Sequence, residues 1–86
     1  MARYLTQHTL ACLTRQGAEE LVKRLHAATG VTARRVLLNM VEGKMLVEFE
    51  AADRDALEKW LAAERFHSDW VLRIEYESRE GKLESV

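Results

Sequence analysis

The 86-residue chain contains no proline, four glycines and a single cysteine, Cys12. One cysteine cannot form a disulfide within the chain, and small secreted domains usually depend on disulfides. We therefore expect a free thiol and a cytoplasmic location. With 48% hydrophobic and 31% charged residues, the composition is typical of a folded domain and unlike that of a disordered tail or linker. We expect one domain spanning residues 1–86.

The chain also lacks an excess of charge and lacks long apolar runs. Thirteen basic and fourteen acidic residues give a net charge of −1, so no positive surplus is present to bind nucleic-acid phosphates. Nowhere do 18 apolar residues follow one another, as a membrane span requires, and residues 1–8 lack the apolar run of a signal peptide. A phosphate-cradling glycine-rich loop is missing too. We expect no nucleic-acid partner, no membrane association and no cofactor.

The hydrophobic periodicity predicts four strands and two helices, in the order strand, helix, strand, strand, helix, strand. Strands are expected over residues 3–13, 35–41, 44–51 and 70–76. The first helix, over residues 15–29, has Thr14 as its N-cap and Gly30 at its other end, and its outer face pairs Glu19 with Lys23 and Glu20 with Arg24. The second helix follows Asp53 as its N-cap and ends near Phe66.

A hairpin is expected in the middle of the chain. Glu42-Gly43 is a two-residue loop with glycine second, which favours a tight turn between two strands. In the strand after it, Met45, Val47 and Phe49 alternate with Leu46, Glu48 and Glu50, so one face is apolar and the other mixed. Residues 78–81 form a further turn, and residues 82–86 either return as a short edge strand or fray.

This order of elements predicts an α+β, ferredoxin-like βαββαβ fold with a four-stranded antiparallel sheet. Right-handed crossovers give the strand order 4-1-3-2 and place both helices on one face. The uncovered face is expected to carry both polar and apolar side chains. They are Glu48, Glu50, Arg73 and Glu75, together with Leu46, Val71, and Leu37 or Val41. Burying the apolar part against a second copy predicts a homodimer.

A candidate ligand site follows from the same geometry. Either His8 or Gln7 is expected beside Glu48 and Arg73 on the uncovered face, where these groups could bind a small acidic or aromatic molecule in a cavity closed by the partner. The simpler alternative is a Glu48–Arg73 salt bridge at a dimer interface. A second hypothesis is an isomerase or cofactor-independent monooxygenase with His8 as the proton-transfer group. A third is a structural or regulatory interaction module.

Other chemical groups give weaker signals. His8, Cys12, His26, His67, Glu48 and Glu50 are the possible metal ligands, but no two have an established ligand spacing, so we expect no metal site. Cys12 is expected to be a small buried hydrophobe rather than a nucleophile. Trp60 and Trp70 are expected in the core or an interface.

Two resemblances bear on the fold. Residues 43–49 resemble the third-strand signature of RNA-recognition domains, but Lys44 and Leu46 occupy the positions whose aromatic rings stack on bases. Most of the chain resembles a small family of uncharacterised bacterial domains, one of them nickel-binding, within the dimeric α/β-barrel superfamily. The residues that carry this resemblance are Arg3-Tyr4-Leu5, Gly43-Lys44, Ala51-Ala52-Asp53 and Phe66-His67-Ser68-Asp69. That family's polar site positions fall at Leu37, Asn39, Val47 and Trp60 here, so the resemblance implies a dimeric barrel and no metal site.

Overall fold

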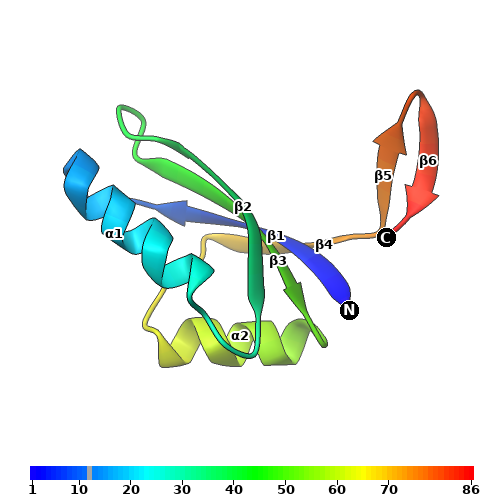
Figure 1. Ribbon diagram of the computed structural model, residues 1–86, viewed down its shortest axis with the longest axis horizontal. Coiled ribbons are helices and arrows are strands. Elements are labelled where there is room, and N and C mark those ends of the chain that lie inside the picture. The colour runs from blue at the N-terminus through cyan, green and yellow to red at the C-terminus, as the bar shows by residue number, and fades with distance from the viewer. Residues whose placement is uncertain (12) are drawn as a thin grey trace.

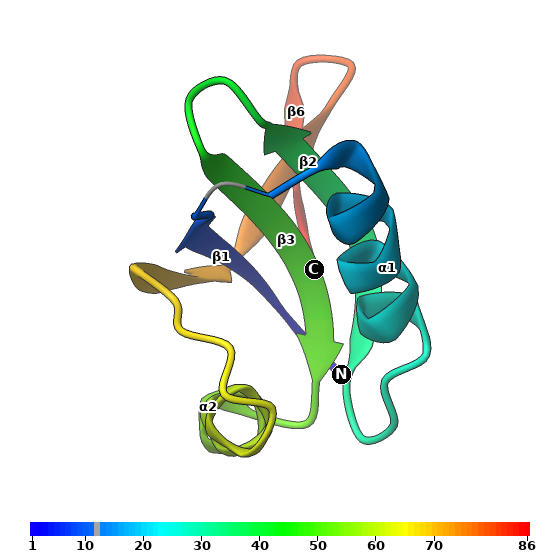
Figure 2. The ribbon, with the colours of Figure 1, turned by 90° about the vertical axis from the view of Figure 1, so that its left-hand side faces the viewer.

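Four antiparallel strands form the main sheet, in the order β2-β3-β1-β4, and two helices lie on one of its sides (Figures 1 and 2). The computed structural model describes residues 1–11 and 13–86. The expected α+β architecture and strand order are confirmed, and they are compatible with a ferredoxin-like fold. The elements are β1 (Ala2–Thr9), α1 (Arg15–His26), β2 (Thr32–Asn39), β3 (Lys44–Ala51), α2 (Arg54–Ala63), β4 (Trp70–Ile74), β5 (Tyr76–Arg79) and β6 (Lys82–Ser85). The expectations for Cys12 lie outside the described residues.

Both helix starts are confirmed as predicted. The Thr14 hydroxyl accepts a hydrogen bond from the Gly17 amide at 3.0 Å, and the Asp53 carboxylate accepts one from the Ala56 amide at 2.8 Å. Each bond satisfies an amide that has no partner within its helix, which is why such residues favour this position. The end of α1 differs from the prediction, because the helix stops at His26 with Ala27 as its cap. Gly30 lies further along, in the loop to β2.

The predicted ion pairs along α1 are replaced by others. Arg15 lies 3.3 Å from Glu19, one turn further along the helix, and Arg24 reaches Glu64 beyond the end of α2 at 3.5 Å. Glu19 is therefore held by Arg15, one turn before it, and the expected pair with Lys23 does not form. Lys23 has no ion pair with any residue that the structure describes.

A β-bulge in β2 explains why its start was predicted three residues too late. Ala33 pairs with Phe49 while Arg35 pairs with Glu48, so Arg34 is an extra residue. The extra residue shifts the alternation of side chains by one position. Val36 then faces the helices, as Ala33 does, although the two residues are an odd number of positions apart. Sequence alternation alone could not detect this strand as one element.

The turn after β2 is longer than the predicted two-residue loop. Asn39 pairs with Lys44, and residues 40–43 form the turn between them. The Asn39 side-chain oxygen accepts a hydrogen bond from the Glu42 amide at 3.0 Å, which stabilises the turn locally. Gly43 has a φ of +67°, and its carbonyl accepts from the Leu10 amide at 2.8 Å. This contact ties the turn to the chain leaving β1.

The core lies between the sheet and the two helices. Phe49, Met45, Val47 and Leu57 have no exposed surface, and Leu25 of α1 and Leu61 of α2 join the same cluster. Phe49 also lies against Trp60, with ring centroids 5.6 Å apart. Trp60, expected in the core or an interface, is half-buried and packs against the core. The third-strand residues predicted to be apolar on one face are the centre of this cluster.

The end of the chain forms a separate hairpin that projects away from the sheet (Figure 1). β4 ends at Ile74, two residues before the prediction, and β5 pairs with β6 across a two-residue loop, Glu80-Gly81. Both loop residues have positive φ, 51° and 81°, as the tight type I′ turn requires. Residues 82–85 are thus a strand rather than a frayed end, but their partner is β5 and not the main sheet.

Candidate functional site: the open face of the sheet

Neither helix covers the other side of the main sheet, and the C-terminal hairpin projects from that side at one end, where Glu77 of β5 meets Arg3 (Figure 1). The strand registers decide which side chains lie there, because residues paired across neighbouring strands point to the same face. We call this surface the open face. Its residues are Arg3, Leu5 and Gln7 of β1, Arg35 and Leu37 of β2, Leu46, Glu48 and Glu50 of β3, and Trp70, Leu72 and Ile74 of β4.

The open face has an apolar centre that crosses all four strands. Leu37 pairs with Leu46, and Leu5 pairs with Leu72 in the neighbouring row. Trp70 lies at the end of the first of these rows, opposite Gln7. Leu72 is 54% exposed, Leu37 50% and Trp70 40%. These are large apolar side chains that the described chain leaves in water.

One end of the open face carries a connected group of charges. The Arg3 guanidinium lies 2.8 Å from the Glu48 carboxylate and 2.6 Å from that of Glu77 in β5. The hydrogen bonds that the Arg3 guanidinium donates to Glu77 and to Glu48 raise the pKa of Arg3 above its ordinary value. Arg34, the bulge residue, lies 3.0 Å from Glu50. Arg3 therefore joins the sheet to the C-terminal hairpin.

Of the three predicted ligand residues, only Glu48 lies on the open face. Arg73 pairs with Tyr4, a residue buried on the helix side, so its placement on the open face was wrong. The physical reason is the way side chains alternate along β4. Val71 packs against the core opposite Thr6, and Arg73, two residues later, points to the same side. Val71 was misplaced for the same reason.

Two further predictions for the open face are settled by the structure. Glu75 lies between β4 and β5 rather than within β4, so the strand registers do not place it on the open face. Of the pair Leu37 or Val41, the open face carries Leu37, while Val41 lies in the turn after β2. Glu50 and Leu46 lie where they were predicted.

His8 lies on the helix side of the sheet, and of the two alternatives it is Gln7 that reaches the open face. The His8 side chain is 1% exposed and its ring stacks on that of Phe66, with centroids 4.0 Å apart and an interplanar angle of 8°. Tyr4 and Thr6 are buried on the same side of β1. The alternation of this strand therefore places His8 in the core, where no ligand reaches it.

Both ring nitrogens of His8 have partners within the protein. Nδ1 lies 2.8 Å from the carbonyl oxygen of His67, and Nε2 lies 2.7 Å from the hydroxyl oxygen of Thr6. A carbonyl oxygen can only accept, so Nδ1 carries the proton and Nε2 accepts from Thr6. Burial away from water lowers the pKa of His8, because the charged ring loses its hydration. The neutral ring is a structural part of the core.

Arg35 is a charged open-face residue that the sequence interpretation did not single out. It lines a small hollow of about 50 Å³ with Glu48 and with Leu5, Leu37 and Leu46. Arg35 forms no ion pair within residues 1–11 and 13–86, unlike Arg3 and Arg34 beside it. A signal for it was present in the sequence, because Arg35 lies two residues before Leu37 in the predicted strand and alternation places both side chains on one face.

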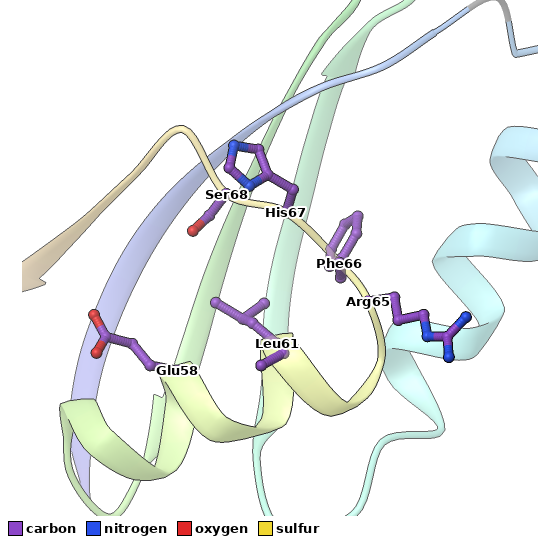
Figure 3. Close-up of a pocket in the computed structure, with 7 residues that line it drawn as sticks. Glu58, Leu61, Arg65, Phe66, His67 and Ser68 are labelled. Carbon is purple, nitrogen blue, oxygen red and sulfur yellow. The ribbon is translucent and has the colours of Figure 1, made fainter.

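A second hollow, of about 480 Å³, lies where the chain leaves α2 (Figure 3). Leu61 and Phe66 form its apolar part. Figure 3 shows the Glu58 and Arg65 side chains on opposite sides of these two residues, so the two charges do not converge on one point. Glu58 is also held by Arg54 at 3.1 Å. This hollow offers no concentrated polar chemistry.

Within the described residues there is no group of three or more histidine, cysteine, aspartate or glutamate side chains that could hold a metal ion. His26 and His67 are exposed. In the same residues, no helix is long and apolar enough to cross a membrane.

Comparison with protein families, with curated proteins and with solved structures found no match for this chain. The family membership suggested by the resemblance therefore stays a prediction.

Proposed function

We propose that the protein works as a homodimeric interaction module in which the open face packs against the same face of a second copy. The observation that carries this proposal is the group of large apolar side chains, Leu37, Leu72 and Trp70, left 40 to 54% exposed across the sheet. A small domain has a thin core, so burying this surface at about 25 cal/mol per Å² would add substantially to its stability. The resemblance to dimeric α/β-barrel domains implies the same assembly.

The charges around the apolar centre suit a two-fold symmetric contact. In such a contact the same patch meets itself, so it must carry both signs of charge. The open face does, with Arg3, Arg34 and Arg35 beside Glu48 and Glu50. Arg35 has no acidic partner among the described residues of its own chain and is free to meet a carboxylate of the second copy.

A ligand enclosed between the two sheets is a second candidate function. The hollow beside Arg35 supports it, because a guanidinium next to three leucines suits a small molecule that is acidic at one end and apolar or aromatic at the other. In this version Arg35 and Glu48 are the polar contacts, in place of the predicted His8 and Arg73.

The position of His8 does not suit a proton-transfer group. An isomerase or monooxygenase using His8 needs that ring within hydrogen-bond reach of a substrate. His8 is enclosed in the core with both nitrogens occupied. A proton-transfer step by this residue would require the core to open.

Light scattering coupled to size-exclusion chromatography tests the dimer. We expect twice the chain mass at micromolar concentration, and we expect Leu72→Lys to give a folded monomer because a buried, unpaired charge opposes association. Val41→Lys is the matched control. Val41 is 98% exposed in the β2–β3 turn, so the same kind of substitution there leaves the dimer intact. A monomeric original protein, or a dimer unaffected by Leu72→Lys, contradicts the proposal.

Native mass spectrometry of freshly purified protein tests the enclosed ligand. The expected result is a dimer carrying extra mass of a small organic acid, with Arg35→Gln remaining dimeric but losing that mass. Lys82→Gln, in the hairpin, is the control for loss of one positive charge. An empty dimer leaves the interaction module without a ligand.

A further inference from the structure

A groove between α1 and β2 lies on the opposite side of the sheet from the open face. It has a volume of about 510 Å³, in the range of small-molecule sites. Ala18 and Val22 of α1 form one wall. Leu38 and Met40 form the other, where β2 runs into its turn. The groove is therefore lined mainly by apolar side chains.

The groove exists because α1 does not fully cover the end of β2. Leu38 pairs with the buried Met45 and so points to the helix side, yet it remains 38% exposed. Met40, two residues on, is 37% exposed. Ala18 is buried, but as the smallest apolar side chain on that part of the helix it leaves space over Leu38. The apolar surface of Leu38 and Met40, on the side of the sheet where the core lies, is therefore open to a ligand.

The charges at the rim of the groove leave one cation available. Arg15 and Glu19 are 3.3 Å apart and neutralise each other. Lys23, one turn further along α1, also lines the groove and has no ion pair with a described residue. An apolar channel beside a single uncompensated ammonium group complements a molecule with an alkyl chain and one negative charge.

We propose that this groove binds an amphiphilic carboxylate, such as a medium-chain fatty acid. The alkyl chain lies along Ala18, Val22, Leu38 and Met40, and the carboxylate meets the Lys23 ammonium group. The site is independent of the proposed dimer, because it lies on the helix side of the sheet.

Displacement of the fluorescent fatty acid 11-(dansylamino)undecanoic acid from the intact chain provides the test. We expect saturable binding of the probe and its displacement by decanoate below the micellar concentration. Decyltrimethylammonium, which has the same alkyl chain and the opposite charge, should displace the probe much less effectively. Equal displacement by both amphiphiles would show that Lys23 does not select the ligand and would overturn the proposal.

Variants assign the binding to this groove. Lys23→Gln should weaken decanoate about two- to five-fold, which is the usual contribution of an exposed charge pair, and should reduce the difference between the two amphiphiles. Met40→Asp should weaken binding further by placing a carboxylate in the apolar wall. Met40 is part of a turn, so this variant is expected to fold, and circular dichroism checks that it does.

Two control variants test whether binding is specific to the groove between α1 and β2. Lys59→Gln removes a lysine that pairs with Asp55 on α2, and it should leave binding unchanged. Leu72→Lys, on the open face, should also leave it unchanged. Loss of binding in Leu72→Lys alone would place the probe between the dimer sheets and contradict this site. A change of oligomeric mass in Met40→Asp without any effect on decanoate would make the groove a protein interface instead.

Discussion

The main sheet and the C-terminal hairpin are built from the same kind of strand but are held in place very differently. The sheet packs a continuous apolar core beneath two helices. The hairpin has no core of its own, and Tyr76 and Leu83 are 51% and 73% exposed. Besides its link to β4, it is joined to the sheet by the Arg3–Glu77 ion pair, while the Val86 amide donates a hydrogen bond to the carbonyl of Glu75 in that link.

This difference shows that strand pairing alone does not stabilise a region. Isolated two-stranded hairpins are marginal in water, whereas a sheet that buries one face is stable. We therefore expect the sheet to carry nearly all of the free energy of unfolding and the hairpin to open locally. The following variants test that division.

Removing core volume from the sheet should have the largest effect. Phe49→Ala is expected to lower the free energy of unfolding by about 3 to 5 kcal/mol, because the lost ring leaves a cavity among Val47, Leu57 and Trp60. Leu83→Ala in the hairpin, where no packing is lost, should change it by less than about 0.5 kcal/mol. Urea denaturation followed by tryptophan fluorescence measures both. If Phe49→Ala does not fold, Phe49→Leu gives the same comparison with a smaller loss of unfolding free energy. Similar losses of unfolding free energy in the two variants would show that the hairpin contributes to stability as much as the sheet does.

Two turn glycines give a finer test of the same division. Gly43 and Gly81 both have positive φ, but a Cβ on Gly43 would lie 3.0 Å from the Leu10 carbonyl oxygen, whereas one on Gly81 would have nothing within 4 Å. Gly43→Ala should cost about 1 to 2 kcal/mol or more in global stability. Gly81→Ala should strain only the hairpin and leave the urea midpoint nearly unchanged. A larger effect from Gly81→Ala would mean that the hairpin is part of the cooperative unit.

Acid should weaken the sheet through His8. Burial holds the folded-state pKa of His8 below the ordinary value of 6.5, against opposing contributions from the His67 carbonyl and the Asp69 carboxylate. Above pH 7 the ring is neutral in both states, so the full stability is present. As the pH falls below about 6.5, the unfolded chain binds a proton that the folded chain resists, and stability falls by up to about 1.4 kcal/mol per pH unit.

The His8→Phe variant removes this titration while keeping a ring to stack on Phe66. Urea midpoints measured from pH 7.5 to 5 should fall in the original protein and stay nearly flat in the variant. His26→Gln, which removes an exposed histidine from α1, should behave like the original protein. Parallel pH curves for the original protein and His8→Phe would show that the buried ring is not the group that titrates.

The smallest expected global effect comes from releasing the hairpin. Glu77→Ala removes the contact with Arg3, so amide hydrogen exchange should become faster in β5 and β6 while the core strands stay protected. Glu84→Ala, which breaks the 3.7 Å pair with Arg79 inside the hairpin, is the control and should change exchange less. Unchanged exchange in Glu77→Ala would show that Arg3 is not the tether.

Much of the fold could be predicted from the sequence because the signals are local. Thr14 and Asp53 cap their helices as predicted, and the alternation of Met45, Val47 and Phe49 identified the buried face of β3. Both signals depend on neighbours a few residues away. The strand order followed from the handedness of the crossovers and the order of elements, which are also properties of the chain itself.

The site was predicted poorly because it depends on which face of the sheet each side chain points to, and that is set by the pairing of strands distant in the sequence. Whether Gln7 or His8 faces outward, and whether Arg73 does, is a matter of one residue of register. The bulge at Arg34 shifts the alternation within a single strand, so that Ala33 and Val36 face the same side. No local pattern records such a shift.

The sequence by itself determined the α+β class, the helix caps and the apolar face of the central strand, since each follows from interactions within a few residues. Only the tertiary structure decided that His8 is a core residue, that the open face centres on Leu37, Leu72 and Trp70, and that the last strands form a separate hairpin. The physical reason is that side chains alternate every residue along a strand, so a one-residue difference in pairing moves a group from the core to the surface.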